Sequence, residues 1–599
     1  MRKNSIFYCS FLTIIITSLF LWPFITLPYV ETAVVGEYKI KEYNQHNDLV
    51  RYLVFILIPT LALFFYKFFI EKVQFNQFFS KFYLDEDSKK LDEKNLIILF
   101  FIFCLILLVR FLYIEFPINQ IDSYHEGQLM SSAFKYYLDG SLWSGSYVTV
   151  GIFYETISSK LAWDFFDNIS IGSTRFLKLF YIFIFKFLLL TLSYQISKTL
   201  KLKYNLNLIF FIFLSLVCVN LNDYDDPVGQ LIHRDIVVVL SIIFFFQIIL
   251  NYKHCKYIIL LIGPLSVFSI LWSIDRGLIV NLIFLIIAIY FLIIKKYIYA
   301  FSLILNIILF WLIAYIYLGD EFNFFIQNTI SILEQGNQVG GIVHPLPLSS
   351  EPNSSRAAKS LVLISFSLII SLNLLSQRES FFSNKFVLML SIISFVSFLT
   401  YSYALGRSDG PHIKSTFGYS IIFFSILSLY LFLIFLEKKI IIRRFLKSIN
   451  VLFIVFFLST FIILSDLNLK NVINFKSRLD TYVSLPDEIF LNNATKSFVS
   501  NSEKILKNYD CIQLYSLDVM MIYLLKKKNC GKFYFISLVG SKKNQERLIK
   551  ELNRTQILLS DNYNEFLSPK NLIKDVDGYV NNSFLELYKE GNWTISKKK

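Results

Sequence analysis

Three ionisable side chains stand close together in one polar stretch of this 599-residue chain: Asp122, His125 and Glu126. A carboxylate in such a group can act as a general base and take a proton from a hydroxyl, provided that the two come within hydrogen-bond reach. The flanking residues predict a helix, because Ser123 and Glu126 fit the capping box that begins a helix and Gly140 fits a helix C-cap. Asp122 would then lie just before the helix, where the backbone N–H groups and the helix dipole favour an anion.

The sequence leaves a plainer interpretation open, in which Glu126 only caps the helix and Asp122 only solvates a loop. Three ionisable groups within five residues are more than a cap requires. We therefore take Asp122 as the first catalytic candidate and Glu126 as the second. The predicted helix would have one apolar side and would lie on a membrane surface. That side consists of Met130, Phe134, Tyr137 and Leu138.

Basic side chains recur at the ends of later apolar runs. Arginine suits bidentate binding of a phosphate, and lysine and histidine add hydrogen-bond donors. The candidates for binding a substrate or its phosphate are His125, His233, Arg234, Arg276, Arg407, His412 and Lys414. For Arg234, pairing with the adjacent Asp235 is an equal alternative. For the clusters around Arg276 and Arg407, plain anchoring of a helix end is as good an explanation. Acidic residues beside phosphate-binding cations at a lipid–water boundary fit chemistry on a lipid-linked phosphate.

Four acidic side chains also stay open as ligands of a divalent metal. Mg²⁺ and Mn²⁺ prefer carboxylate oxygens, and the candidates are Asp122, Glu126, Asp225 and Asp226. Spacing along the chain does not by itself bring these four together, so the sequence makes no cofactor certain.

The positions of these groups depend on the apolar runs between them. Hydrophobic residues make up 55% of the chain and charged residues 17%, and a soluble globule does not hide so much apolar surface. A bilayer core of about 30 Å needs roughly 20 apolar residues in a helix. The chain is therefore predicted to be a mostly α-helical, polytopic membrane protein with about 13 transmembrane helices. These spans lie near 6–27, 52–70, 96–114, 176–197, 206–220, 236–252, 257–274, 278–294, 298–317, 359–375, 386–404, 418–436 and 449–465.

Lysine and arginine residues indicate which way the spans cross. Short cytoplasmic loops carry an excess of these residues, and here such loops alternate with loops that carry few, starting from Arg2 and Lys3. The pattern predicts a cytoplasmic N-terminus and places the loop 115–175 and the chain from 466 onward on the opposite side. It also explains the net charge of +14 without nucleic acid as a partner, since no basic and aromatic groove is recognisable.

The region from 466 to 599 differs in composition and contains no further apolar run of spanning length. Strands and helices are predicted to alternate at 511–516, 517–528, 533–537, 542–552 and 556–560. This βαβαβ order implies a small parallel sheet with right-handed crossovers. Cys511 and Cys530 fall at or just before the starts of two neighbouring strands, so they are candidates for a disulfide in an oxidising compartment.

At this point the chain resembles the GT-C superfamily of membrane glycosyltransferases, which use sugars linked to polyprenyl phosphate. The resemblance rests on the many-span body, on the large outer loop after span 96–114 with its acidic motif Asp122-Ser-Tyr-His-Glu126, and on a soluble domain after the last span. It implies a catalytic Asp or Glu in that loop and basic residues in later outer loops that hold the lipid phosphate.

The resemblance also suggests a division of the chain. The two N-terminal spans are an addition to the usual GT-C plan. We therefore expect an N-terminal extension (1–95), a catalytic transmembrane body (96–465) and a C-terminal α/β domain (466–599).

The sequence thus predicts an inverting glycosyltransferase that moves a sugar from a polyprenyl-phosphate donor to a glycan, lipid or protein acceptor of the cell envelope. We expect it in a bacterial inner membrane, with its C-terminal domain in the periplasm. Two alternatives stay open. A polymerase or ligase of lipid-linked glycans ranks lower, because such proteins more often carry their main functional loop late in the chain. A transporter also ranks lower, because no internal repeat is recognisable and the ionisable clusters lie at helix ends.

Overall fold

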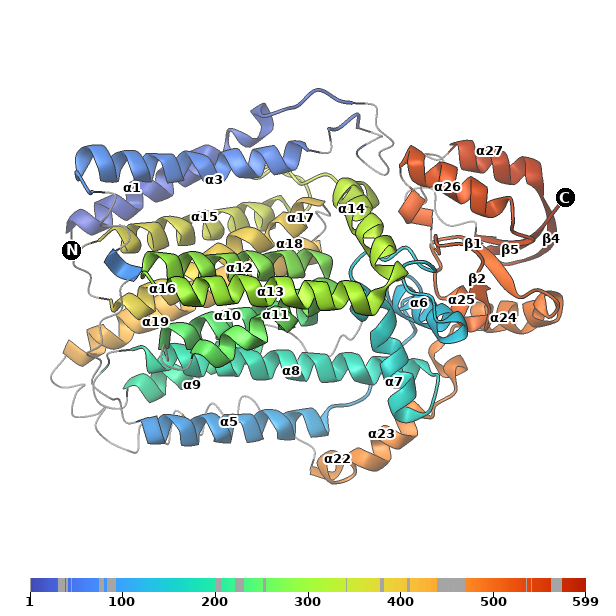
Figure 1. Cartoon of the computed structure of the whole chain (residues 1–599), viewed down its shortest axis with the longest axis horizontal. Coiled ribbons are helices and arrows are strands. Elements are labelled where there is room, and N and C mark those ends of the chain that lie inside the picture. Colours follow the sequence, from blue (N-terminus) through green and yellow to red (C-terminus); the bar gives the residue numbers. More distant parts are fainter. Residues whose placement is uncertain are drawn as a thin grey trace.

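A bundle of long helices and a separate small sheet make up the molecule, which we describe from a computed structural model (Figure 1). The structure describes residues 2–30, 38, 41–44, 46–74, 80–82, 93–200, 202, 206–220, 231–250, 255–340, 342–377, 382–406, 410–438, 456, 469–534, 536–539, 541–561 and 574–599. The N-terminus and the C-terminal sheet lie at opposite ends of the bundle (Figure 1).

Within the described residues, eleven helices are long and apolar enough to cross a membrane. They are α1 (Arg2–Leu19), α3 (Asn47–Phe65), α5 (Glu93–Tyr113), α8 (Ile171–Lys198), α10 (Ile236–Leu250), α11 (Cys255–Trp272), α12 (Ile274–Ile293), α13 (Tyr297–Leu318), α15 (Ser354–Ser376), α16 (Asn384–Thr400) and α19 (Gly418–Lys438). Each coincides with a predicted span. The predicted span 206–220 is the shorter helix α9 (Leu206–Asn220), and the predicted span 449–465 lies, apart from Phe456, outside the described residues. The prediction of a mostly α-helical polytopic membrane protein is confirmed.

Shorter elements join the long helices. The helices between or after them are α6 (His125–Asp139), α7 (Ser158–Phe166), α14 (Asp320–Gly340), α17 (Ser402–Gly406), α18 (Gly410–Thr416), α22 (Leu469–Ile473) and α23 (Phe475–Val483). The single turns are η1 (Trp22–Phe24), η2 (Tyr66–Ile70), η3 (Ser80–Phe82), η4 (Phe153–Ile157), η5 (Leu231–Asp235), η7 (Asp487–Phe490) and η8 (Ile536–Val539). Helices α1 and α3 pack against α15, where Phe11, Tyr52 and Leu361 share one hydrophobic core.

The C-terminal region folds around a five-stranded sheet. Its strands are β1 (Cys511–Tyr515), β2 (Lys528–Asn529), β3 (Ile557–Asp561), β4 (Phe584–Glu590) and β5 (Trp593–Lys598), in the order β2-β1-β3-β5-β4. Its helices are α24 (Asn493–Leu506), α25 (Met521–Leu524), α26 (Lys542–Leu552) and α27 (Lys574–Ser583). β1 pairs in parallel with β3, as predicted, and also with β2, which the sequence analysis did not predict. β5 pairs antiparallel with β3 and β4.

The predicted strand at 533–537 is wrong. The carbonyl of Phe533 accepts hydrogen bonds from the side-chain amides of Gln513 and Asn529 instead of entering the ladder, and the chain continues into the turn η8. The β4–β5 hairpin was not predicted. Its signal is Gly591, whose positive φ of 57° suits the two-residue turn between the strands.

Helix α6 lies between the bundle and the C-terminal region, and the prediction that it lies on a membrane surface is wrong. Met130 and Phe134 are buried in a core that includes Met520 and Tyr523, whereas Tyr137 and Leu138 are each 47% exposed. The backbones approach so closely that a Cβ at Gly127 would lie 2.5 Å from the nitrogen of Met520. Protein therefore covers the apolar side of this helix at Met130 and Phe134, the part that was expected to face the membrane surface.

Candidate functional site

Asp122 caps helix α6. Its Oδ1 accepts hydrogen bonds from the backbone N–H groups of Tyr124 (3.0 Å) and His125 (2.9 Å). The predicted cap was Ser123, which is wrong because the carboxylate one residue earlier reaches both N–H groups. The predicted C-cap Gly140 is confirmed, with a φ of 71°. Asp122 is thus the anion at the helix start that the sequence predicts.

The second carboxylate oxygen of Asp122 lies 2.7 Å from Nδ1 of His125. Both side chains are partly open to solvent, at 28% for Asp122 and 38% for His125. Burial acts to raise the pKa of Asp122, but the hydrogen bonds and charge of His125 and the N–H of Tyr124 outweigh it, so the pKa lies below its ordinary value. An ionised carboxylate that orients an imidazole in this way is the arrangement of a general-base pair.

Glu126 has a different environment. It is buried, and its two oxygens lie 2.8 Å from Nε and 2.8 Å from Nη2 of Arg175 at the start of α8. One of these oxygens also accepts the backbone N–H of Asp122 at 3.0 Å. Arg175 in turn donates to the carbonyls of Pro117 and Asn119. Glu126 therefore ties the loop that carries Asp122 to the transmembrane bundle.

The C-terminal region holds the same loop from the other side. The N–H of Met520 donates to the carbonyl of Ser123 at 3.1 Å, and the N–H of Ile121 donates to the carbonyl of Phe490 at 2.9 Å. The hydroxyl of Ser131 donates to the carbonyl of Val519 at 2.7 Å. The position of Asp122 thus depends on segments almost 400 residues apart in sequence.

Two of the predicted arginines meet beside one tyrosine. The guanidinium carbons of Arg234 and Arg276 lie 4.9 Å and 5.0 Å from the ring centroid of Tyr403. Arg276 forms ion pairs with Asp235 and Asp275. The suggested pairing of Arg234 with its neighbour Asp235 is wrong, because Asp235 pairs with Arg276. Arg234 makes a looser contact of 3.8 Å with Asp275.

The other predicted basic residues divide into three groups. His233 lies 2.9 Å through Nε2 from the hydroxyl of Tyr154, and the ring of His412 lies 5.0 Å from that of Tyr403, so both belong to the arginine cluster. Lys414 is exposed on α18. Arg407, like the metal-ligand candidates Asp225 and Asp226, lies outside the described residues. Among the residues that are described, no group of three or more His, Cys, Asp or Glu side chains is arranged to hold a metal ion.

Glu155 is a candidate residue that the sequence analysis missed. It is fully buried in the π-helical turn η4, and it accepts the N–H groups of Thr149 (2.9 Å) and Val150 (3.0 Å) and the hydroxyl of Thr149. Burial raises its pKa to about 7, against the opposing effect of these hydrogen bonds and of the charge of Arg234. A π-helical turn with a perturbed acid is typical of functional sites.

Glu155 is electrostatically linked to both groups described above, since the charge of Arg234 acts on it and it acts on Tyr534. Burial and then the neighbouring carboxylate of Glu155 raise the pKa of Tyr534 well above its ordinary value, and Tyr124 also acts on this hydroxyl. Both Glu155 and Tyr124 therefore act on the hydroxyl of Tyr534. The carboxylate–imidazole pair and the arginine cluster thus lie at the same end of the bundle, near the C-terminal region.

No protein-family model and no curated protein sequence matches the chain. Solved structures similar to it include those of ArnT from Cupriavidus metallidurans in the apo state and bound to undecaprenyl phosphate. They share 10% and 11% sequence identity with the chain, at TM-scores of 0.39 and 0.40. Each comparison covers 84% of this chain and 98% of the ArnT chain.

Proposed function

We propose that the protein is a membrane glycosyltransferase that transfers a sugar from a polyprenyl-phosphate donor to a hydroxyl group of a cell-envelope glycan, lipid or protein. The observation that carries the proposal is Arg234. Its side chain is 2% exposed, yet its Nε and Nη2 have no hydrogen-bond partner within the described part of the chain. An unpaired buried donor costs about 1–3 kcal/mol, and more when the group is charged. A phosphate oxygen is an acceptor that a guanidinium fits well.

The neighbours of Arg234 suit this role. Asp235 and Asp275 form ion pairs with Arg276 beside Tyr403, whereas Arg234 makes the looser 3.8 Å contact with Asp275. The cluster lies where α10 and α12 begin. A lipid-linked phosphate would reach this depth with its polyprenyl chain in the bilayer and its sugar directed towards the loop 115–175. The resemblance of this loop to that of GT-C enzymes supports the same assignment.

Asp122 and His125 supply the proton acceptor in this proposal. The carboxylate of Asp122 already accepts three hydrogen bonds, and it orients the imidazole so that Nε2 is left as the base. The acceptor hydroxyl gives its proton to this nitrogen while its oxygen attacks the anomeric carbon. The bond from that carbon to the phosphate oxygen breaks on the opposite side, so the configuration inverts. The lipid phosphate leaves with its added negative charge next to Arg234.

The expected location follows from the sequence. The N-terminus and the C-terminal region lie at opposite ends of the bundle (Figure 1), which agrees with the alternation of basic loops. We place the N-terminus in the cytoplasm, the site at the outer face of a bacterial inner membrane, and the C-terminal region in the periplasm.

A transfer assay in purified membranes tests the proposal. Labelled polyprenyl-phosphate sugars serve as donors and extracted cell-envelope glycans as acceptors, and Asp122→Asn and His125→Gln are compared with wild type at equal folded protein. We expect each variant to lose transfer by about 10²–10⁴-fold, as for loss of general-base catalysis. Asp139→Asn, at the exposed end of α6, is the matched control and should keep wild-type activity.

The variants also distinguish two roles of the Asp122 carboxylate, which is either the base itself or the group that orients His125. Full activity in His125→Gln with loss in Asp122→Asn would make the carboxylate itself the base, as the sequence alone suggests. Full activity in both variants would refute the proposed site. Substrate flux into vesicles without a new glycosidic bond would replace the glycosyltransferase by a transporter.

A further inference from the structure

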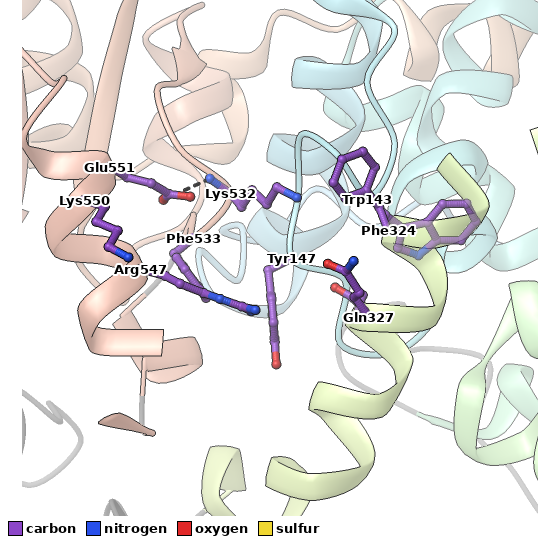
Figure 2. Close-up of a pocket in the computed structure, with 10 residues that line it drawn as sticks. Trp143, Tyr147, Phe324, Gln327, Lys532, Phe533, Arg547, Lys550 and Glu551 are labelled. Carbon is purple, nitrogen blue, oxygen red and sulfur yellow. Dashed lines mark hydrogen bonds between the residues drawn. The ribbon is translucent and has the colours of Figure 1, made fainter. Parts of the chain in front are cut away.

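A cavity of about 310 Å³ lies between the loop before η4, helix α14 and the C-terminal region (Figure 2). Its lining comes from all three segments. The lining residues are Trp143, Tyr147, Phe324, Gln327, Asn328, Lys532, Phe533, Arg547, Lys550 and Glu551. Its volume lies at the lower end of the range typical of small-ligand sites, about 300–1,000 Å³.

The cavity carries an excess of positive charge. Lys532, Arg547 and Lys550 line it, and Glu551 is the one acidic residue of the lining (Figure 2). Glu551 is already engaged, because its carboxylate accepts the backbone N–H of Lys532 at 3.1 Å. Burial lowers the pKa of Lys532 against the opposing charges of Glu551 and Glu321, and the positive charge of Arg547 acts in the same direction as burial. An anionic ligand would relieve this crowding of cations.

The opposite wall is aromatic and firmly held. The hydroxyl of Tyr147 lies 2.7 Å from that of Ser331 on α14, and the ring of Tyr147 lies 5.2 Å from that of Phe533. The amide of Asn328 pairs with both the N–H (3.0 Å) and the carbonyl (2.7 Å) of Val148. Phe324 lies under the ammonium of Lys532, at 4.2 Å from its ring centroid. The wall is therefore preformed rather than assembled by the ligand.

We propose that this cavity binds an anionic saccharide, one whose sugar rings carry carboxylate or phosphate groups. Rings of Tyr147 and Phe324 offer apolar faces to the C–H face of a sugar, Gln327 offers an amide for its hydroxyls, and Arg547 with Lys550 pairs with its charges. A neutral saccharide would leave the cations without partners. An inorganic anion would leave the aromatic wall unused.

The cavity extends along the C-terminal region. A second cavity of about 400 Å³ shares Lys532, Lys550 and Glu551 with the first and continues to Arg554 and the linked cysteines. Cys511 and Cys530 form a disulfide there. The two cavities together give the saccharide a path longer than one ring.

The cavity also adjoins residues that interact with the buried acid Glu155. Phe533 lines the cavity, while Tyr534, the next residue, lies beside Glu155. Tyr147 lines the cavity, while the backbone and hydroxyl of Thr149 bind Glu155. If the protein carries out the proposed glycosyl transfer, the anionic saccharide is the acceptor. This assignment of the acceptor is the one step here that rests on the proposed function.

Binding can be measured without any transfer. Full-length protein purified in detergent is titrated calorimetrically with tetragalacturonate, with the methyl-esterified form of the same tetramer, and with inorganic phosphate. We expect the acid form to bind and both other probes to bind at least about tenfold more weakly, because each lacks either the charges or the rings. Failure here with intact transfer activity would leave the proposed function standing.

Variants locate the site. Arg547→Gln with Lys550→Gln, two exposed positions on α26, should weaken tetragalacturonate binding by about tenfold or more, and Phe324→Ala should do the same through the aromatic wall. Lys542→Gln, exposed on the same helix but outside both linings, should bind as wild type. Binding that ignores Arg547, Lys550 and Phe324, or equal binding of phosphate and tetramer, would overturn the proposal.

Discussion

Replacing Glu126 by Gln separates a structural from a catalytic role for this residue. In the structure the side chain of Glu126 is 1% exposed and that of Arg175 is 0% exposed. One oxygen of Glu126 accepts a hydrogen bond from Arg175, and the other accepts from both Arg175 and the N–H of Asp122. In Glu126→Gln an amide NH₂ must face at least one donor in either orientation, and the guanidinium loses its counter-charge.

The magnitude follows from this geometry. Breaking a buried ion pair by removing one partner costs about 3–5 kcal/mol, because the other charge stays buried without compensation. Lys178, 3.8 Å from the same carboxylate, adds a second cation to the unbalanced site. We therefore expect Glu126→Gln to lower the free energy of unfolding by about 3–5 kcal/mol. The loop that carries Asp122 loses an anchor at the same time.

Equilibrium unfolding in mixed micelles measures the loss, with transfer activity recorded on the same preparations. The double variant Glu126→Gln with Arg175→Met should recover most of the stability, since it removes the uncompensated charge. Asp164→Asn is the matched control. It breaks the exposed pair of Lys160 and Asp164 and should cost less than about 1 kcal/mol.

One outcome would refute this reasoning. If Glu126→Gln unfolded as wild type does and yet abolished transfer, Glu126 would be the reacting acid, and its contact with Arg175 would not be a stabilising one. Equal stability of the single and the double variants would likewise show that the buried charge is not the cause of the loss.

Three further predictions concern the phosphate site, the buried acid and the disulfide. Arg234→Gln should raise the KM for the donor about ten- to hundredfold, the effect expected from losing a charge-assisted hydrogen bond, and Arg234→Lys should not restore the wild-type KM. Initial rates at varied donor concentration measure the KM, and an unchanged value would contradict the prediction. Burial raises the pKa of Glu155 from 4.5 to about 7, so its stabilising contribution is full below pH 4.5 and is lost as the pH rises through 7. The stability of Glu155→Gln relative to wild type should therefore increase by about 3 kcal/mol between pH 4.5 and about pH 8, and a difference independent of pH would contradict the burial of this acid. Replacing Cys511 and Cys530 by Ser should destabilise the C-terminal region by about 3 kcal/mol through loop-closure entropy. In wild type, alkylation with and without reductant should show that both cysteines are oxidised, and free thiols would contradict an oxidising location.

The transmembrane helices were predictable from the sequence because their signal is local. About 20 apolar residues in a row can be satisfied in lipid only as a helix, so α10 and α12 follow from their own residues. The C-cap at Gly140 is local for the same reason, since a positive φ suits glycine. The polar composition from 466 onward likewise separated the C-terminal region, and the order of its first strands indicated the parallel pairing of β1 and β3.

Pairings between distant residues were not predictable in this way. Arg276 pairs with Asp235 on another helix, although Asp235 has Arg234 as its neighbour in sequence. Helix α6 was expected on a membrane surface, but its Met130 and Phe134 pack against the C-terminal region. An apolar side specifies burial and leaves open which surface provides it.

The sequence by itself determined that the protein is a helical membrane protein, that Asp122, His125 and Glu126 lie together, and that Asp122 lies at a helix start. The tertiary structure alone decided how these groups differ. Glu126 is buried against Arg175, Asp122 stays partly exposed beside His125, and Glu155 becomes a buried acid with a pKa of about 7. The reason is that desolvation and ion pairing set the energy of a charge, and both depend on which distant segments surround it.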